Sequence, residues 1–148
     1  MIYYYRLTVN TPTTNNSEQF LLAIPITMNQ LFINTASALC YSIIQQCCQS
    51  ADSPNHFPHN DIVRFVLQQH NRMPDYLRFP IFLLTLFFNF WGLIAGGSPF
   101  YRQPHKMRWD QVCAWKNAPI SICRDLIRFY ESLVVLGWKS EQMNRIKV

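Results

Sequence analysis

The chain has 148 residues, the size of one domain, which buries about two thirds of the surface that its unfolded form exposes and needs no disulfide to fold. Apolar residues make up 49% and charged residues only 14%, against roughly 25% in an average soluble domain, so we expect some apolar surface to meet a partner or a membrane. The net charge of +5 arises in residues 61–148, which carry 12 Lys and Arg against 6 Asp and Glu, and it permits an acidic protein, nucleic acid or anionic lipid as a partner.

The N-terminal residues 1–26 are expected to form a flexible tail. Residues 10–17 are all Thr, Asn, Pro or Ser, and such a composition cannot bury enough apolar surface to offset the entropy lost on ordering. Thr27 is a candidate N-cap of a first long helix. The sequence therefore predicts a helical domain over residues 27–140, followed by a C-terminal tail over residues 141–148.

A loop with two prolines separates the first helix from the second. Asn60 can cap a helix over residues 61–73, in which apolar residues follow helical spacing. Pro74 breaks the chain, and residues 73–79 are expected to form a short turn of helix. Pro80 suits the first position of the helix that follows.

Residues 78–102, "RFPIFLLTLFFNFWGLIAGGSPFYR", carry no charged side chain between the two terminal arginines. Their hydropathy permits a membrane span, but Pro80 near the start and glycines near the end limit the uninterrupted helix to about 15 residues, which suits a buried core helix better. We therefore expect a central apolar helix over residues 79–95, with Asn89 hydrogen-bonded inside the protein. The alternative is that residues 79–97 span or insert into a membrane.

Two helices are predicted after this stretch, over residues 105–117 and 119–138. The second has the clearest amphipathic pattern in the chain, with Leu126, Tyr130 and Val134 on its apolar side. The predicted fold is all-α, a small orthogonal or up-down bundle of about five helices around the central apolar helix.

The five cysteines are odd in number and lie within helical patterns, which argues against a secreted disulfide framework. The N-terminus lacks a signal-peptide pattern, so we expect a cytoplasmic protein, or alternatively a membrane-associated one. His56 and His59 could chelate a metal by spacing, but no cysteine or carboxylate cluster completes the set. We also find no phosphate-binding glycine loop, nucleophile elbow or paired carboxylates, and we therefore expect no metal, no cofactor and no catalytic residue.

A basic and aromatic segment, "RWDQVCAWKNAPISICRDLIRFYES", is the best candidate for a binding site. Arg124 and Arg128 lie one helical turn apart and repel each other unless carboxylates or phosphates meet them. They are expected either to pair internally with Asp110, Asp125 or Glu131, or to dock an acidic partner surface. The predicted partner-binding residues are Arg108, Trp109, Lys116, Arg124 and Arg128. An acidic protein is favoured over nucleic acid.

The stretches "MPDYLRFPIFLLTLFF" and "GGSPFYRQPHKMRWDQVCAWKNAPISICRDLIRFYESLVVLGW" lie within residues 73–138. This region resembles the small helical proteins that accompany flavin-dependent alcohol dehydrogenases of the glucose-methanol-choline type. The most specific portion is the series Arg-Trp, Trp-Lys-Asn, Arg-Asp-Leu and Tyr-Glu-Ser-Leu. The chain lacks the flavin-binding glycine motif, so the resemblance implies a companion and not the catalytic chain.

The function expected from the sequence is therefore a non-catalytic accessory or interaction subunit. Its partner would be a flavoprotein dehydrogenase subunit or another acidic protein. The alternative is a small membrane-associated protein that uses residues 79–97 to span or insert.

Overall fold

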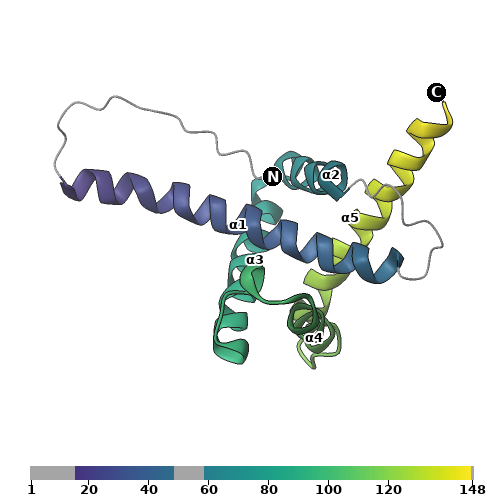
Figure 1. The fold of residues 1–148 in the computed structure, drawn as a ribbon. Coiled ribbons are helices and arrows are strands. Elements are labelled where there is room, and N and C mark those ends of the chain that lie inside the picture. The colour runs from purple at the N-terminus through teal and green to yellow at the C-terminus, as the bar shows by residue number, and fades with distance from the viewer. Residues whose placement is uncertain (1–15, 49–58, 148) are drawn as a thin grey trace. The chain divides into compact units, whose positions relative to one another are not determined.

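The computed structural model describes residues 16–48 and 59–147 of the chain. These residues form five α-helices and one 3-10 turn and contain no strand, so the predicted all-α bundle of about five helices is confirmed. In chain order the elements are α1 (Asn16–Cys48), α2 (His59–Arg72), α3 (Asp75–Gly96), η1 (Phe100–Arg102), α4 (His105–Lys116) and α5 (Ser121–Ile146) (Figure 1).

The chain divides into two compact units, residues 1–30 and residues 31–148. α1 begins at Asn16, so the part of the predicted tail from residue 16 onward is helical, and the helix continues through Pro25 at the cost of one backbone hydrogen bond. The rest of that tail, and most of the predicted proline-rich loop with His56, lie outside the described residues. At the other end α5 extends to Ile146, beyond the predicted end of the domain at residue 140.

The hydrophobic core lies within residues 31–148 and is built from all five helices and η1. α5 packs against α2 and α4 along most of its length and against α3 more narrowly (Figure 1). Its predicted apolar side faces the core, where Leu126, Tyr130 and Val134 are at most 3% exposed. α5 is thus a shared neighbour of α2, α4 and α3.

α3 is longer than the sequence predicted, with 22 residues in place of about 15. The predicted short turn of residues 73–79 and the apolar stretch form one helix, because Pro80 keeps a helical φ and costs only one hydrogen bond near the helix start. Gly92 does not interrupt it either. The predicted glycine stop is confirmed: Gly97 has a left-handed φ of 71°, and its N–H donates to the carbonyl of Leu93.

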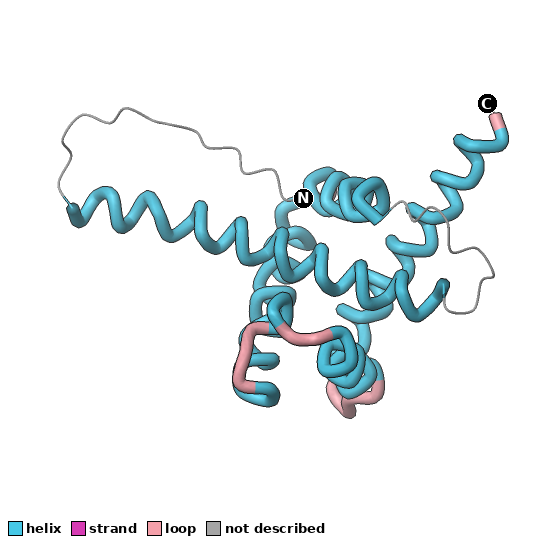
Figure 2. The backbone as a smooth tube through the Cα atoms, in the orientation of Figure 1, coloured by secondary structure: helices cyan, strands magenta, loops and turns pink. Residues whose placement is uncertain are grey.

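Two short connections join α3 to α4 and α4 to α5, and the first of them contains η1 (Figure 2). In the first, η1 directs the side chain of Phe100 into the core, where its ring lies 4.5 Å from that of Phe88, centroid to centroid. This contact anchors η1 to the middle of α3. The residues beyond the end of α3 are thus folded back onto that helix.

Candidate functional site

α3 has two sides of opposite character. One side, which we call the outer face, consists of large apolar side chains that are 42% to 76% exposed. Its members are Tyr76, Leu77, Phe79, Leu83, Phe87, Phe90, Trp91, Leu93 and Ile94. The structure thus encloses only one side of the helix that the sequence predicted to be the centre of the bundle.

The opposite side, which we call the inner face, contains Thr85, Phe88, Asn89 and Gly92, all of them buried. The hydroxyl of Thr85 donates to the carbonyl of Ile81 at 2.8 Å and accepts from the hydroxyl of Tyr130 on α5 at 2.9 Å. Leu86 and Phe88 are buried on this side as well. The polar side chains Thr85 and Asn89 thus face the protein together with two large apolar ones, while the large apolar side chains of the outer face are exposed, which is unusual for a helix of a soluble protein.

Asn89 is fully buried, and its side-chain oxygen accepts from the backbone N–H of Tyr101 at 3.5 Å. The prediction that Asn89 is hydrogen-bonded in the protein interior is therefore confirmed. Its Nδ2 has no hydrogen-bond partner among the residues that the structure describes. The amide thus serves to hold η1 against α3 and does not face the outer side.

Two glutamines attach to backbone carbonyls of α3. Gln103 donates to the carbonyls of Gly92 and Ser98, each at 2.9 Å, and Gln111 on α4 donates to the carbonyl of Phe88 at 2.7 Å. The close approach requires a glycine at position 92, because a Cβ there would lie 2.9 Å from atoms of both glutamine side chains. The inner face is therefore closely packed and specific in shape.

Two of the predicted partner-binding residues are turned partly inward. The guanidinium of Arg108 lies over the ring of Tyr41 on α1, 5.6 Å from its centroid, and burial lowers the pKa of Arg108. Trp109 is half-buried and packs against the core. Both residues contribute to the contact of α4 with its neighbours.

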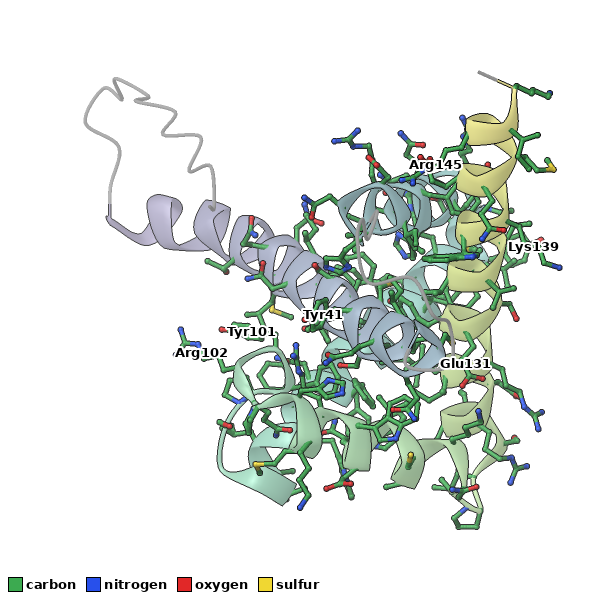
Figure 3. The ribbon with its side chains drawn as sticks, turned by 45° about the vertical axis from the view of Figure 1, so that its right-hand side comes forward. Tyr41, Tyr101, Arg102, Glu131, Lys139 and Arg145 are labelled. Atoms are coloured by element: carbon green, nitrogen blue, oxygen red, sulfur yellow. The ribbon has the colours of Figure 1, made fainter. Side chains whose placement is uncertain are left out.

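The other three predicted residues have partners within the chain. Lys116 forms an ion pair with Glu131 on α5 at 2.7 Å, and Arg124 donates to the carbonyls of Ala118 and Pro119. Glu131 of α5 is labelled in Figure 3. The internal carboxylate pairing expected for Arg124 is thus not seen: Arg124 binds backbone carbonyls, and Glu131 pairs with Lys116.

Arg128 differs from the other basic residues. Its side chain is 68% exposed, and its nearest carboxylate, that of Asp125, lies 3.9 Å away. A contact of this length between exposed groups holds the guanidinium only weakly. Arg128 is thus the most accessible cation of the predicted set.

The histidines His70 and His59 are buried and partly buried, respectively. His70 is buried with its ring 4.6 Å from that of Phe32, and its Nε2 lies 3.3 Å from the carbonyl oxygen of Arg78. Burial lowers the pKa of His70 and that of His59. Among residues 16–48 and 59–147, no group of three or more His, Cys, Asp or Glu side chains is placed to hold a metal ion.

Comparison with known proteins assigns no function to the chain, so the functional clue comes from the length and apolar character of α3. No family model, curated protein or solved structure matches the chain. In the part of the chain that the structure describes, α3 is the one helix that is long and apolar enough to cross a membrane. Its most apolar window has a mean hydropathy of 1.8, and only 28% of that window is buried.

Sequence reasoning considered residues 79–97 as a whole and did not separate the two faces. The signal was present in the spacing of the polar and small residues. Thr85, Asn89, Gly92 and Gly96 follow one another at intervals of four, three and four, which places them on one side of a helix. The side opposite to them could therefore have been identified as the outer face.

Proposed function

We propose that the protein is a membrane-associated protein whose α3 lies along the membrane surface, with its outer face inserted among the lipid chains. The observation that carries this proposal is the outer face of α3, where large apolar residues are exposed while the polar residues Thr85 and Asn89 of the same helix are buried. A helix with this arrangement finds its apolar partner outside the protein.

Lipid is favoured over a protein partner because the outer face offers almost no hydrogen-bonding groups. Between Phe79 and Ala95, Trp91 is the one exposed residue with a polar side-chain atom. The other polar groups lie at the start of α3, where Tyr76 carries a hydroxyl and Arg78 pairs with Asp75. Protein interfaces usually form about one hydrogen bond per 100–200 Å². Hydrocarbon needs none, and indole rings such as that of Trp91 are enriched at the membrane interface.

Insertion along the surface is favoured over a span, although 22 residues make about 33 Å of helix, enough to cross the hydrocarbon. Thr85, near the middle of α3, is hydrogen-bonded to Tyr130 on α5. In a spanning arrangement the neighbours of Tyr130, Arg128 and Glu131, would lie near the bilayer centre, at a cost of about 2.5–3.5 kcal/mol each. With α3 in the surface plane, these charges stay in water.

Sedimentation with phosphatidylcholine vesicles tests the proposal. In the variant Leu83→Ser/Phe90→Ser/Ile94→Ser we expect vesicle binding to fall about 100-fold, because each side chain contributes about 1 kcal/mol of apolar contact. The matched control, Ile122→Ser/Leu136→Ser/Ile146→Ser, removes three exposed apolar side chains from α5 and should bind as the wild type does. Equal losses in the two variants would contradict the proposal.

The depth of insertion separates the two orientations. In Leu83→Trp the added indole lies near the middle of α3. The difference in fluorescence between this variant and the wild type, which has four tryptophans, reports on the added indole and can be quenched by lipids brominated at different depths. Insertion along the surface predicts quenching by bromine near the headgroups. Quenching chiefly by bromine near the chain ends would show that α3 spans.

We propose as a second candidate that the chain is an accessory subunit that docks an acidic surface of a flavoprotein dehydrogenase. The exposure of Arg128 favours it. Arg128→Glu should weaken co-purification with a co-expressed dehydrogenase of this type about tenfold. The matched control is Arg64→Glu on α2, since Arg64 is 71% exposed and lies 3.8 Å from Asp61. An unchanged yield with Arg128→Glu would exclude docking through this residue.

A further inference from the structure

A cavity of about 260 Å³ lies beside the C-terminal end of α3. It is lined by Trp91 and Gly96 of α3, by Gln103 after η1, and by Met107, Asp110 and Gln111 of α4. One water molecule occupies about 30 Å³ in the liquid, so the cavity has room for a small organic group.

Gln111, which lines this cavity, carries an unpartnered acceptor. Its side chain is 7% exposed, and its orientation is fixed because Nε2 donates to the carbonyl of Phe88 at 2.7 Å. Its Oε1 is buried and has no hydrogen-bond partner among the described residues. A buried acceptor without a donor is costly, so a ligand that brings a donor is favoured there.

The remaining polar atoms also favour a cationic donor. The carboxylate of Asp110 lines the same cavity and forms no ion pair with the rest of the described chain. Gln103 has no free donor, because both hydrogens of its Nε2 are used by the carbonyls of Gly92 and Ser98. The C-terminal end of α3 adds the negative end of a helix dipole.

The position of the cavity connects it to the outer face of α3. Trp91 belongs to both, and it is 42% exposed. An indole ring beside a carboxylate is a favourable environment for a cation. A group bound in the cavity would therefore lie at the edge of the surface that contacts lipid.

We propose that this cavity binds a primary ammonium group, and that in the membrane-bound protein the group belongs to the headgroup of an ethanolamine phospholipid. The second part rests on the proposed membrane association. The ammonium donates to Oε1 of Gln111 and to the carboxylate of Asp110. A choline headgroup has no N–H to donate, so the site prefers ethanolamine over choline lipids.

Vesicle binding with and without ethanolamine lipid tests this preference. Replacing part of the phosphatidylcholine by phosphatidylethanolamine should strengthen binding of the wild type about fivefold to tenfold. Asp110→Asn removes the charge, and Ala114→Leu places a larger side chain in the cavity wall. Both variants should bind pure phosphatidylcholine as the wild type does and lose the increase. Asp125→Asn, an exposed carboxylate on α5, should keep it.

Vesicles with diacylglycerol in place of phosphatidylethanolamine control for lipid packing, since they loosen the surface without supplying an amine. An increase that persists in both Asp110→Asn and Ala114→Leu would overturn the inference. Absence of binding to any vesicle would instead contradict the proposed function, and the cavity is then tested in solution.

In solution, ethanolamine should shift the side-chain amide resonances of Gln111 in the full-length protein, whereas choline should not. The shift should be lost in Ala114→Leu. If ethanolamine shifts these resonances but phosphatidylethanolamine gives no increase, the ligand is a soluble amine and the lipid part of the inference is wrong. If neither has an effect, the whole inference is wrong.

Discussion

α3 and α5 are both long helices that share one core, yet the sides that they turn toward it differ in polarity. α5 buries Leu126, Tyr130 and Val134 and exposes Arg128, as an amphipathic helix of a soluble protein does. α3 buries Thr85 and Asn89 beside Leu86 and Phe88, and it exposes the large apolar residues of its outer face. The difference shows that a helix can complete the core through a side that includes polar residues, and that overall hydropathy does not say which side faces inward.

The strongest test of this comparison uses two neighbouring phenylalanines of α3. Phe88 is fully buried and its ring lies 4.8 Å from that of Trp115, so Phe88→Ala should lower the free energy of unfolding by about 3–5 kcal/mol. Phe90 is 45% exposed, and Phe90→Ala should cost less than about 1 kcal/mol in water. Urea denaturation measures both values. Similar losses would mean that the two faces are not distinct.

Glycine packing gives the next largest effect. A Cβ at Gly92 would lie 2.9 Å from the backbone nitrogen of Phe100, which cannot move aside easily, so Gly92→Ala should destabilise the fold by about 1–3 kcal/mol. At Gly137 of α5 the nearest atom is in the side chain of Phe65, at 3.0 Å, and that ring can turn. We expect Gly137→Ala to change the stability by less than about 1 kcal/mol, since alanine favours the helix. Thermal unfolding of the two variants provides the measurement.

The hydroxyl that joins α5 to the inner face predicts an effect at alkaline pH. Burial raises the pKa of Tyr130, so the folded state keeps the phenol neutral, while the phenol of the unfolded chain ionises above about pH 10. Stability is therefore complete below pH 10 and falls as the pH rises further, by about 1 kcal/mol at pH 11. Burial also raises the pKa of Cys40 to about 12, which adds a similar fall from pH 9.

Tyr130→Phe should make the fall above pH 10 less steep and leave the part due to Cys40, and it should cost about 1 kcal/mol at neutral pH through the lost hydrogen bond with Thr85. Denaturation curves at several pH values give both effects. The matched variant on the outer face, Tyr76→Phe, should leave the stability unchanged, since Tyr76 is 74% exposed. A fall that is identical in Tyr130→Phe and the wild type would contradict the assignment.

The smallest expected effect concerns the pair Lys116 and Glu131, which ties α4 to α5. Their side chains are 48% and 27% exposed, so the coupling free energy should be only about 0.5 kcal/mol and should decrease with added salt. A double-mutant cycle with Lys116→Ala and Glu131→Ala measures it. A coupling of several kcal/mol would instead make this pair a main determinant of the fold.

The sequence was sufficient to predict the fold class, because the apolar spacing of α2 and α5 and the glycine stop at Gly97 are local signals. The bounds of α1 and α3 were predicted less well. Pro80 was expected at the start of its helix, and residues 1–26 were expected to be a tail. Pro25 and Pro80 instead lie inside helices, because each removes only one hydrogen bond and the remaining bonds and packing are sufficient to continue the helix. The cost of a proline therefore depends on contacts that the sequence does not display.

The candidate site was predicted only in part. Residues 79–97 were recognised as able to contact a membrane, but the division into two faces depends on which side meets Tyr130 and the glutamines of η1 and α4. For the basic segment, the sequence shows the residues but not their contacts. Its charges are visible in the sequence, whereas the partners of Lys116 and Arg124 within the chain follow from tertiary contacts.

The two faces of α3 should differ in how fast their residues are substituted during evolution. The outer face requires only that side chains be large and apolar, so among homologous chains Leu83, Phe90 and Ile94 should be replaced freely by other large apolar residues. Gly92 is fixed by the atoms that surround it, and Thr85 by its hydroxyl partner. A single helix would thus combine fast and slow substitution rates, alternating with the period of its turns.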